Sequence, residues 1–142
     1  NASANMGQEA VNNDQRSSQY LDGCGAKRMR ESLAGDVREE LGHATMLAGQ
    51  IKVLDGAPLG WQGLKMAQTS LQPPKGTLDV IDVCKGVIEA EQGAIDQYQK
   101  IIEATDGIDP VTQDLCIELK GDEEEHRRLF KGFLAELEAG QM

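Results

Sequence analysis

The chain contains two histidines, and each is the last residue of a Glu-x-x-His motif. The motifs are Glu40-Leu41-Gly42-His43 and Glu123-Glu124-Glu125-His126. On an α-helix, residues three apart lie on the same face, so each motif presents a carboxylate oxygen and an imidazole nitrogen toward one point. With Glu at roughly one position in ten, both histidines would complete such a motif by chance about one time in a hundred. The spacing therefore predicts two metal-binding motifs.

A third glutamate, Glu91, is expected to join these motifs. Glu40, Glu91 and Glu123 each fall on an apolar stripe and near the middle of a predicted helix, where a bundle normally places Leu or Ile. Buried carboxylates need a cation or a proton. We expect a dinuclear centre with Glu40 and Glu123 bridging the ions, His43 and His126 on one ion each, and Glu91 on one of them. Carboxylate and imidazole ligands without thiolate favour iron or manganese and also allow zinc.

Four segments with the hydrophobic period of a helix are expected to position these residues. They cover approximately residues 4–21, 26–54, 78–104 and 110–138, and turn signals such as Asp55-Gly56-Ala57-Pro58 separate them. Thr77 is expected to cap the third helix. The buried stripes are expected to extend to Leu54 in the second helix and to begin at Ile81 in the third. With 4% aromatic residues and long stretches without proline, the chain is predicted to be all-α and to form one domain over residues 1–142.

The connection between the second and third predicted helices is long enough to cross the whole bundle. Residues 55–77 could extend to roughly 75 Å, whereas a helix over 26–54 is about 43 Å long. The other two connections are short and are typical of antiparallel neighbours. We therefore expect two antiparallel helical hairpins joined by one long crossover.

Composition argues against several partners and compartments. The formal charge is −10, from 14 basic and 24 acidic residues, so nucleic acid is not expected as a partner. No apolar run approaches the length of a membrane-spanning helix. Cys24, Cys84 and Cys116 are too few and too scattered for a disulfide scaffold, which favours the cytoplasm. Cys84 and Cys116 are expected on opposite sides of the metal level, about 20 Å apart, too far for a disulfide within one chain.

Several segments resemble the bacterioferritins and their relatives in the ferritin-like superfamily. Residues 37–44 (VREELGHA) and 51–58 (IKVLDGAP) are similar to the second helix and its exit in that group, residues 91–98 to the third helix and residues 122–126 to the fourth. The resemblance covers approximately residue 25 to the C-terminus. It implies a ferritin-like four-helix bundle with two iron ions per subunit. It also implies a ferroxidase that oxidises Fe(II) with O2 or H2O2 and stores Fe(III) in a homo-oligomeric shell.

Two positions depart from the bacterioferritin pattern. Haem-binding bacterioferritins have Met directly after the bridging Glu of the second helix, whereas this chain has Leu41, so we expect no haem. The first helix of the family also supplies a Glu ligand, and the residue nearest that level here is Gly7. Glu9 lies close to the right level and Asp14 lies on the apolar-facing stripe. The first-helix ligand is therefore Glu9, Asp14 or none, in which case water fills the position.

The other residues near the motifs can be explained by structural roles as well as by functional ones. Tyr98 is expected to pack in the core, although it could donate an electron to the metals. The other acidic residues near the motifs are expected to be solvated: Glu89, Asp122, Glu124 and Glu125. Two further functions stay open, namely a di-iron or di-manganese oxidase or peroxidase of the rubrerythrin type without a storage role, and a ferritin-like scaffold that has lost its metal.

Overall fold

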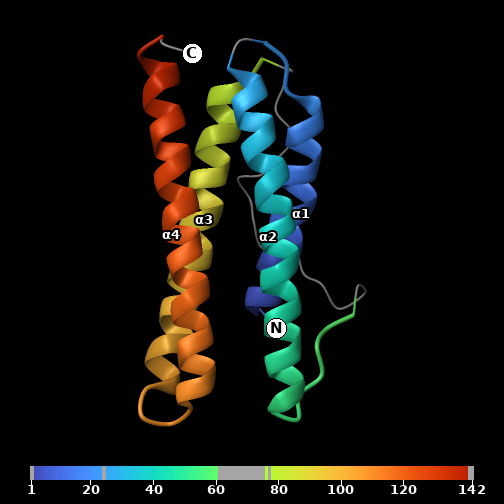
Figure 1. Ribbon diagram of the computed structural model, residues 1–142, viewed down its shortest axis with the longest axis vertical. Helices are drawn as coiled ribbons and strands as arrows, with labels where there is room; N and C mark the ends of the chain where they lie inside the picture. Colours follow the sequence, from blue (N-terminus) through green and yellow to red (C-terminus); the bar gives the residue numbers. More distant parts are fainter. Residues whose placement is uncertain (1, 24, 61–75, 77, 141–142) are drawn as a thin grey trace.

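The computed structural model describes residues 2–23, 25–60, 76 and 78–140, and these residues form an all-α bundle (Figure 1). Its helices are α1 Ala2–Tyr20, α2 Ala26–Val53, α3 Val80–Thr105 and α4 Pro110–Glu138. α1 and α2 form one antiparallel hairpin, α3 and α4 form another, and the two hairpins pack side by side. The predicted fold is confirmed, and every predicted helix end lies within two residues of the observed one.

α2 and α3 run in the same direction (Figure 1). α2 ends at one end of the bundle and α3 begins at the other, so the chain must travel the length of the bundle between them, as the sequence predicts. Within the described part of the chain, no helix combines the length and the apolar character needed to cross a membrane.

Local chemistry explains where the helices begin. Asp109 accepts a hydrogen bond from the Thr112 backbone N–H at 3.1 Å, and Pro110 stands in the first turn of α4, where its missing N–H costs nothing. α3 begins after Asp79, whose side chain does not cap the helix and instead accepts from the N–H of the preceding Gly76 at 2.7 Å. The expected cap, Thr77, lies outside the described residues. Before α2, Gly25 has φ 83°, a left-handed conformation that glycine adopts without steric cost.

The hydrophobic core is divided into two clusters. The larger cluster lies near the turn between α1 and α2 and includes Cys84 and Phe130, each 0% exposed. The smaller one contains Leu47, Tyr98, Cys116 and Leu119. The two cysteines are free and occupy different clusters, as their spacing predicts. Tyr98 packs in the core, as predicted, and electron donation stays an untested alternative.

Two residues predicted at the ends of the buried stripes are exposed in the structure. Ile81 is 37% exposed and Leu54 is 57% exposed, whereas both were expected to be buried. At about 100° per residue, Ile81 points roughly 80° to one side of Glu91 and Val83 roughly 80° to the other, and the buried face at this end of α3 is on the Val83 side, with Val80 and Cys84. Leu54 directly follows the last residue of α2, and it lines an open pocket with residues of α1, α3 and α4 instead of packing in the core.

Candidate metal centre

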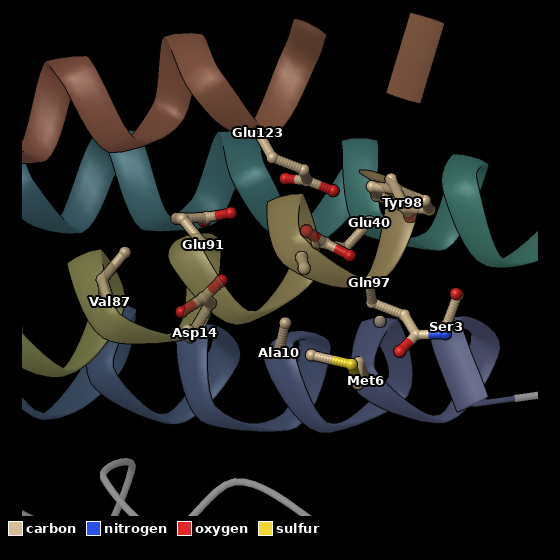
Figure 2. Close-up of a pocket in the computed structure, with 13 residues that line it drawn as sticks. Ser3, Met6, Ala10, Asp14, Glu40, Val87, Glu91, Gln97, Tyr98 and Glu123 are labelled. Carbon is tan, nitrogen blue, oxygen red and sulfur yellow. The ribbon is translucent and has the colours of Figure 1, made fainter. Parts of the chain in front are cut away.

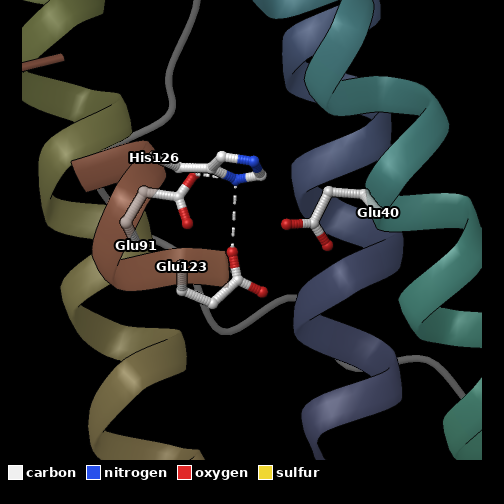
Figure 3. A group of neighbouring side chains, drawn as sticks. All are labelled: Glu40, Glu91, Glu123 and His126. Carbon is white, nitrogen blue, oxygen red and sulfur yellow. Dashed lines mark ion pairs between the residues drawn. The ribbon is translucent and has the colours of Figure 1, made fainter. Parts of the chain in front are cut away.

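Midway along the bundle, four buried side chains point toward one another (Figure 3). Glu40 comes from α2, Glu91 from α3, and Glu123 and His126 from α4. Each offers one donor atom, and these atoms all lie within 4.8 Å of one another. None of the four residues is more than 7% exposed. The structure thus brings together four of the five residues predicted as ligands in a group that could hold a metal ion.

The fifth, His43, lies beside the same group and is 4% exposed. Its Nδ1 is 3.1 Å from Glu123 Oε1. The other oxygen of that carboxylate, Oε2, is 3.5 Å from His126 Nδ1. Glu123 therefore stands between the two histidines, which is where a carboxylate that bridges two ions would have to be.

Each histidine has a second carboxylate on its outer nitrogen. His43 Nε2 is 3.2 Å from Asp122 Oδ2, and His126 Nε2 is 2.8 Å from Glu39 Oε2. Asp122 directly precedes Glu123, and Glu39 directly precedes Glu40, so the acidic residue before each motif contacts the histidine of the other motif. An Nε2–H that donates to a carboxylate leaves Nδ1 with a lone pair facing the centre, as a metal ligand requires.

The sequence prediction that Asp122 is a solvated residue is only partly confirmed. Its side chain is 48% exposed, yet it contacts buried His43 instead of standing free in solvent. Glu124 and Glu125 are exposed as predicted and pair with Lys120 and Arg128 of their own helix. The acidic residue before each motif glutamate is visible in the sequence, but the crossing of partners between α2 and α4 depends on the tertiary structure.

At the level of Glu40, α1 presents Gly7. A Cβ built on Gly7 would lie 3.2 Å from Glu40 Oε2, so the α1 backbone passes directly beside that side chain. Both alternative first-helix residues are buried, Glu9 and Asp14 each at 4% exposure. Asp14 lines the same cavity as Glu40 and Glu91 (Figure 2), although neither Asp14 nor Glu9 belongs to the group within 4.8 Å.

The centre is consequently asymmetric. One position is surrounded by four donors, Glu40, Glu91, Glu123 and His126. Beside His43 the inner carboxylate is Glu123, with Oε1 3.1 Å from Nδ1, and α1 passes Glu40 with Gly7. Two ions bound here would have unequal protein ligand sets.

Burial and crowding oppose ionisation of the three glutamates together. Burial, and then the neighbouring Glu123, raise the pKa of Glu40 to about 9, and the same two causes hold the pKa of Glu91 well above its usual range. Burial also acts to raise the pKa of Glu123, but the His126 and His43 rings outweigh it and lower that pKa to about 2. The centre thus needs protons or cations to balance its charge.

Another buried carboxylate, Asp36, lies behind His126. It is 5% exposed, and its Oδ1 is 3.9 Å from His126 Nε2. Burial raises its pKa to about 6. Burial acts to lower the pKa of His126, but Glu123, Asp36 and Glu39 outweigh it and raise that pKa to about 10. The sequence reading missed Asp36, although it lies one helical turn before Glu40 on the same face.

The donor set fits a hard divalent metal. Glu123 Oε2 and His126 Nδ1 are buried, and within the described part of the chain neither has a hydrogen-bond partner. A buried polar atom without a partner is costly unless a water molecule or an ion satisfies it. Three carboxylates with imidazole nitrogens and no thiolate are ligands that iron and manganese accept.

A family model described as a ferritin-like domain matches residues 2–139 of the chain. No curated protein matches the sequence significantly. Among solved structures, the bacterioferritin-related protein of Bacteroides fragilis, described as a dodecameric thioferritin, superposes with a TM-score of 0.89 at 22% identity, over 99% of this chain and 84% of that one.

Two further structures have the same fold. A ferritin-like di-iron-carboxylate protein from Bacillus anthracis gives a TM-score of 0.81 at 17% identity, over 93% of this chain and 89% of that one. A variant of the Dps protein of Listeria innocua gives 0.79 at 20% identity, over 94% and 91%.

Proposed function

The chain belongs to the family of ferritin-like domains, and from this premise we propose that it is the subunit of an iron-storage ferroxidase. Fe(II) is the substrate, O2 or H2O2 is the oxidant, and Fe(III) is the product stored inside a homo-oligomeric shell. The observation that carries the proposal is the buried group of Glu40, Glu91, Glu123 and His126, whose donor atoms lie within 4.8 Å. His43 is proposed as the fifth ligand.

The chain's own residues would prepare the centre for two cations. Glu40 and Glu123 project from α2 and α4 and can each face two ions, while Glu91 adds charge on the His126 side. Asp122 and Glu39 fix the ring orientation of the histidines. Since the pKa of Glu40 is raised to about 9, ion binding near pH 7 releases protons, and affinity rises with pH.

The redox balance is simple. Each Fe(II) gives one electron, so two ions reduce one H2O2 with two protons to two molecules of water, or one O2 with two protons to H2O2. Anionic carboxylate ligands favour the ferric product, because they stabilise the higher charge. A pair of ions at one centre supplies both electrons together.

Assembly is proposed from the same comparison. The similar bacterioferritin-related protein is described as dodecameric, which supports a shell of identical subunits here without fixing its size. Exposed apolar residues such as Ile108 and Val111, at 79% and 65%, are available for contacts between subunits.

Aerobic titration with Fe(II) tests the activity. We expect the ferric absorbance to rise much faster than in buffer, and Glu91→Gln to slow it at least tenfold by removing one ligand charge. Glu89→Gln is the matched control, because Glu89 is exposed on the same helix and should leave the rate unchanged. A wild-type rate no faster than buffer would refute the ferroxidase proposal.

A further inference from the structure

A pocket opens at the end of the bundle where α1 begins and α2 ends (Figure 1). The volume open to a water-sized molecule is about 100 Å³, compared with about 10 Å³ in the cavity beside Gly7. All four helices contribute to its lining, which ranges from exposed Leu54 to buried Cys116, at 57% and 1% exposure. This end pocket therefore leads from the surface into the smaller hydrophobic cluster.

The lining of the end pocket is largely apolar. Its apolar side chains are Ala4, Leu47, Ile51, Leu54, Ile101 and Leu115, with the Cys116 thiol beside them. The polar side chains Gln50 and Thr112 bond to each other, with 2.9 Å between Nε2 and Oγ1, and the Thr112 hydroxyl also donates to Asp109. Ser3 Oγ is buried and has no hydrogen-bond partner among the described residues. The pocket thus offers space but few of the partners that a polar molecule needs.

The end pocket adjoins the candidate metal centre. Leu47 lies one turn beyond His43 on the same face of α2. Ser3 is the residue common to the end pocket and the cavity that contains the Glu40 carboxylate (Figure 2). It lies one turn before Gly7, where the α1 backbone passes Glu40. The two spaces therefore approach each other at a small side chain.

Size and polarity favour dioxygen among the small molecules that the proposed reaction uses. O2 moves from water into apolar space without giving up hydrogen bonds. H2O2 carries two O–H donors, for which Ser3 is the one side chain of the lining with a buried, unpartnered acceptor among the described residues. Fe(II) carries a charge that an apolar lining excludes. An apolar cavity of roughly 150 Å³ holds benzene or xenon, so the end pocket is large enough for a diatomic molecule.

We propose that the end pocket binds O2 and delivers it past Ser3 to the candidate metal centre. The delivery rests on the proposed function, because it needs iron in the centre, whereas binding of O2 in the pocket needs no metal. The end pocket thereby gives the oxidant an apolar route of its own, and O2 is the oxidant that takes it.

NMR relaxation under O2 pressure tests the binding in the metal-free protein. O2 is paramagnetic, so methyl protons relax faster where O2 resides. The increase over the rate under N2 should be at least twofold larger for the methyl groups of Leu47, which are 8% exposed, than for those of Leu33, which is 0% exposed in the larger cluster. An increase at Leu47 no larger than at Leu33 would overturn the proposal.

Filling the pocket tests the delivery. Ala4→Phe and Leu115→Phe should each place a ring in the end pocket and lower the O2-induced relaxation at Leu47 at least twofold. Each should also raise the O2 concentration for half-maximal Fe(II) oxidation at least threefold, while oxidation by H2O2 keeps its rate. Ala104→Phe is the matched control, because Ala104 is exposed on α3 near the same end of the bundle, and it should change none of these quantities.

The outcomes separate binding, delivery and the proposed function. An unchanged O2 dependence of oxidation in both filled variants, with less O2 at Leu47, would overturn the delivery. A wild-type chain that holds O2 at Leu47 but does not oxidise Fe(II) would overturn the proposed function and the delivery with it, and would leave the O2 site in place.

Discussion

Glu123 has the central position among the side chains of this centre. Its two oxygens face different histidines, at 3.1 Å and 3.5 Å, and its pKa is the one lowered to about 2 while its glutamate neighbours are raised. Those histidines are in turn held by Asp122 and Glu39. The inner carboxylates would set the charge of the metal site, and the outer ones set the geometry of its nitrogen donors.

Asp122→Asn and Glu39→Gln test this division of roles. Each variant keeps the volume of the side chain but removes the charge that orients a histidine, so affinity for the ion next to that histidine should fall about 10- to 100-fold. Asp122→Asn should weaken the ion beside His43, and Glu39→Gln the ion beside His126. Two-site Mn(II) titration measures both constants.

Glu125→Gln provides the control, because Glu125 is exposed and pairs with Arg128. It should leave both constants within twofold. If Asp122→Asn and Glu39→Gln behave like this control, the outer carboxylates do not orient the ligands.

The helices differ in what they bring to the centre. α4 supplies Asp122, Glu123 and His126, α2 supplies Glu39, Glu40 and His43, α3 supplies Glu91, and α1 passes closely with a glycine. Each contributing helix uses one face, and residues one turn away on that face anchor it in the hydrophobic clusters. On α4, Leu119 lies one turn before Glu123 and is 0% exposed.

Leu119→Ala should destabilise the protein by about 2–5 kcal/mol, because it leaves a cavity in the smaller hydrophobic cluster. Ile117→Ala is the matched change on the same turn of α4, and with 51% of Ile117 exposed its cost should be within about 0.5 kcal/mol. Chemical denaturation of the metal-free protein gives both values. Equal effects would mean that α4 buries a different face.

Considered as one body, the bundle carries a layer of buried charge between two hydrophobic clusters. The raised pKa values in that layer, about 9 for Glu40, about 6 for Asp36 and about 10 for His126, mean that the folded metal-free state binds more protons than the unfolded chain. Stability then falls as pH rises. The pKa of Glu123 is instead lowered to about 2, from an ordinary value of 4.5. This group therefore makes stability rise with pH, but only below pH 4.5.

The melting temperature in the presence of a chelator should therefore decrease between pH 5 and pH 8. Each additional proton held over one pH unit is worth about 1.4 kcal/mol, so the decrease should be at least roughly 3 °C. Glu40→Gln should flatten the slope, and saturating Mn(II) should abolish or reverse it, because the ions replace the protons. A melting temperature that rises with pH in the chelated wild type would contradict this charge assignment.

Assembly distinguishes storage from the two other functions. A storage shell should sediment as a large homo-oligomer and retain far more than two iron ions per chain after aerobic loading. An oxidase or peroxidase of the rubrerythrin type should give a small oligomer with about two ions per chain, and a metal-free scaffold should retain none after anaerobic loading. Analytical ultracentrifugation with elemental analysis of the same sample decides between them.

Local patterns in the sequence predicted most of the fold. Helical periodicity and turn residues predicted four helices with ends correct to within two residues, and the long link between the second and third predicted their parallel directions. The candidate metal ligands could be predicted in the same way, because the spacing of residues along one helix determines which side chains share a face. Glu40, Glu91, Glu123 and His126 are such residues, and they converge. The periodicity failed at Ile81 and Leu54, where the helix register drifts or the bundle ends.

Only the tertiary structure decided how the helices meet. The pairing of Asp122 with His43 and of Glu39 with His126 joins residues of different helices, and no spacing along one helix contains that information. The same holds for the burial of Asp36 and for the water-sized cavity beside Gly7, which depend on how closely α1 approaches Glu40. The sequence determines on which face of its own helix each side chain lies. How closely the faces of different helices approach depends on the packing of all four helices together.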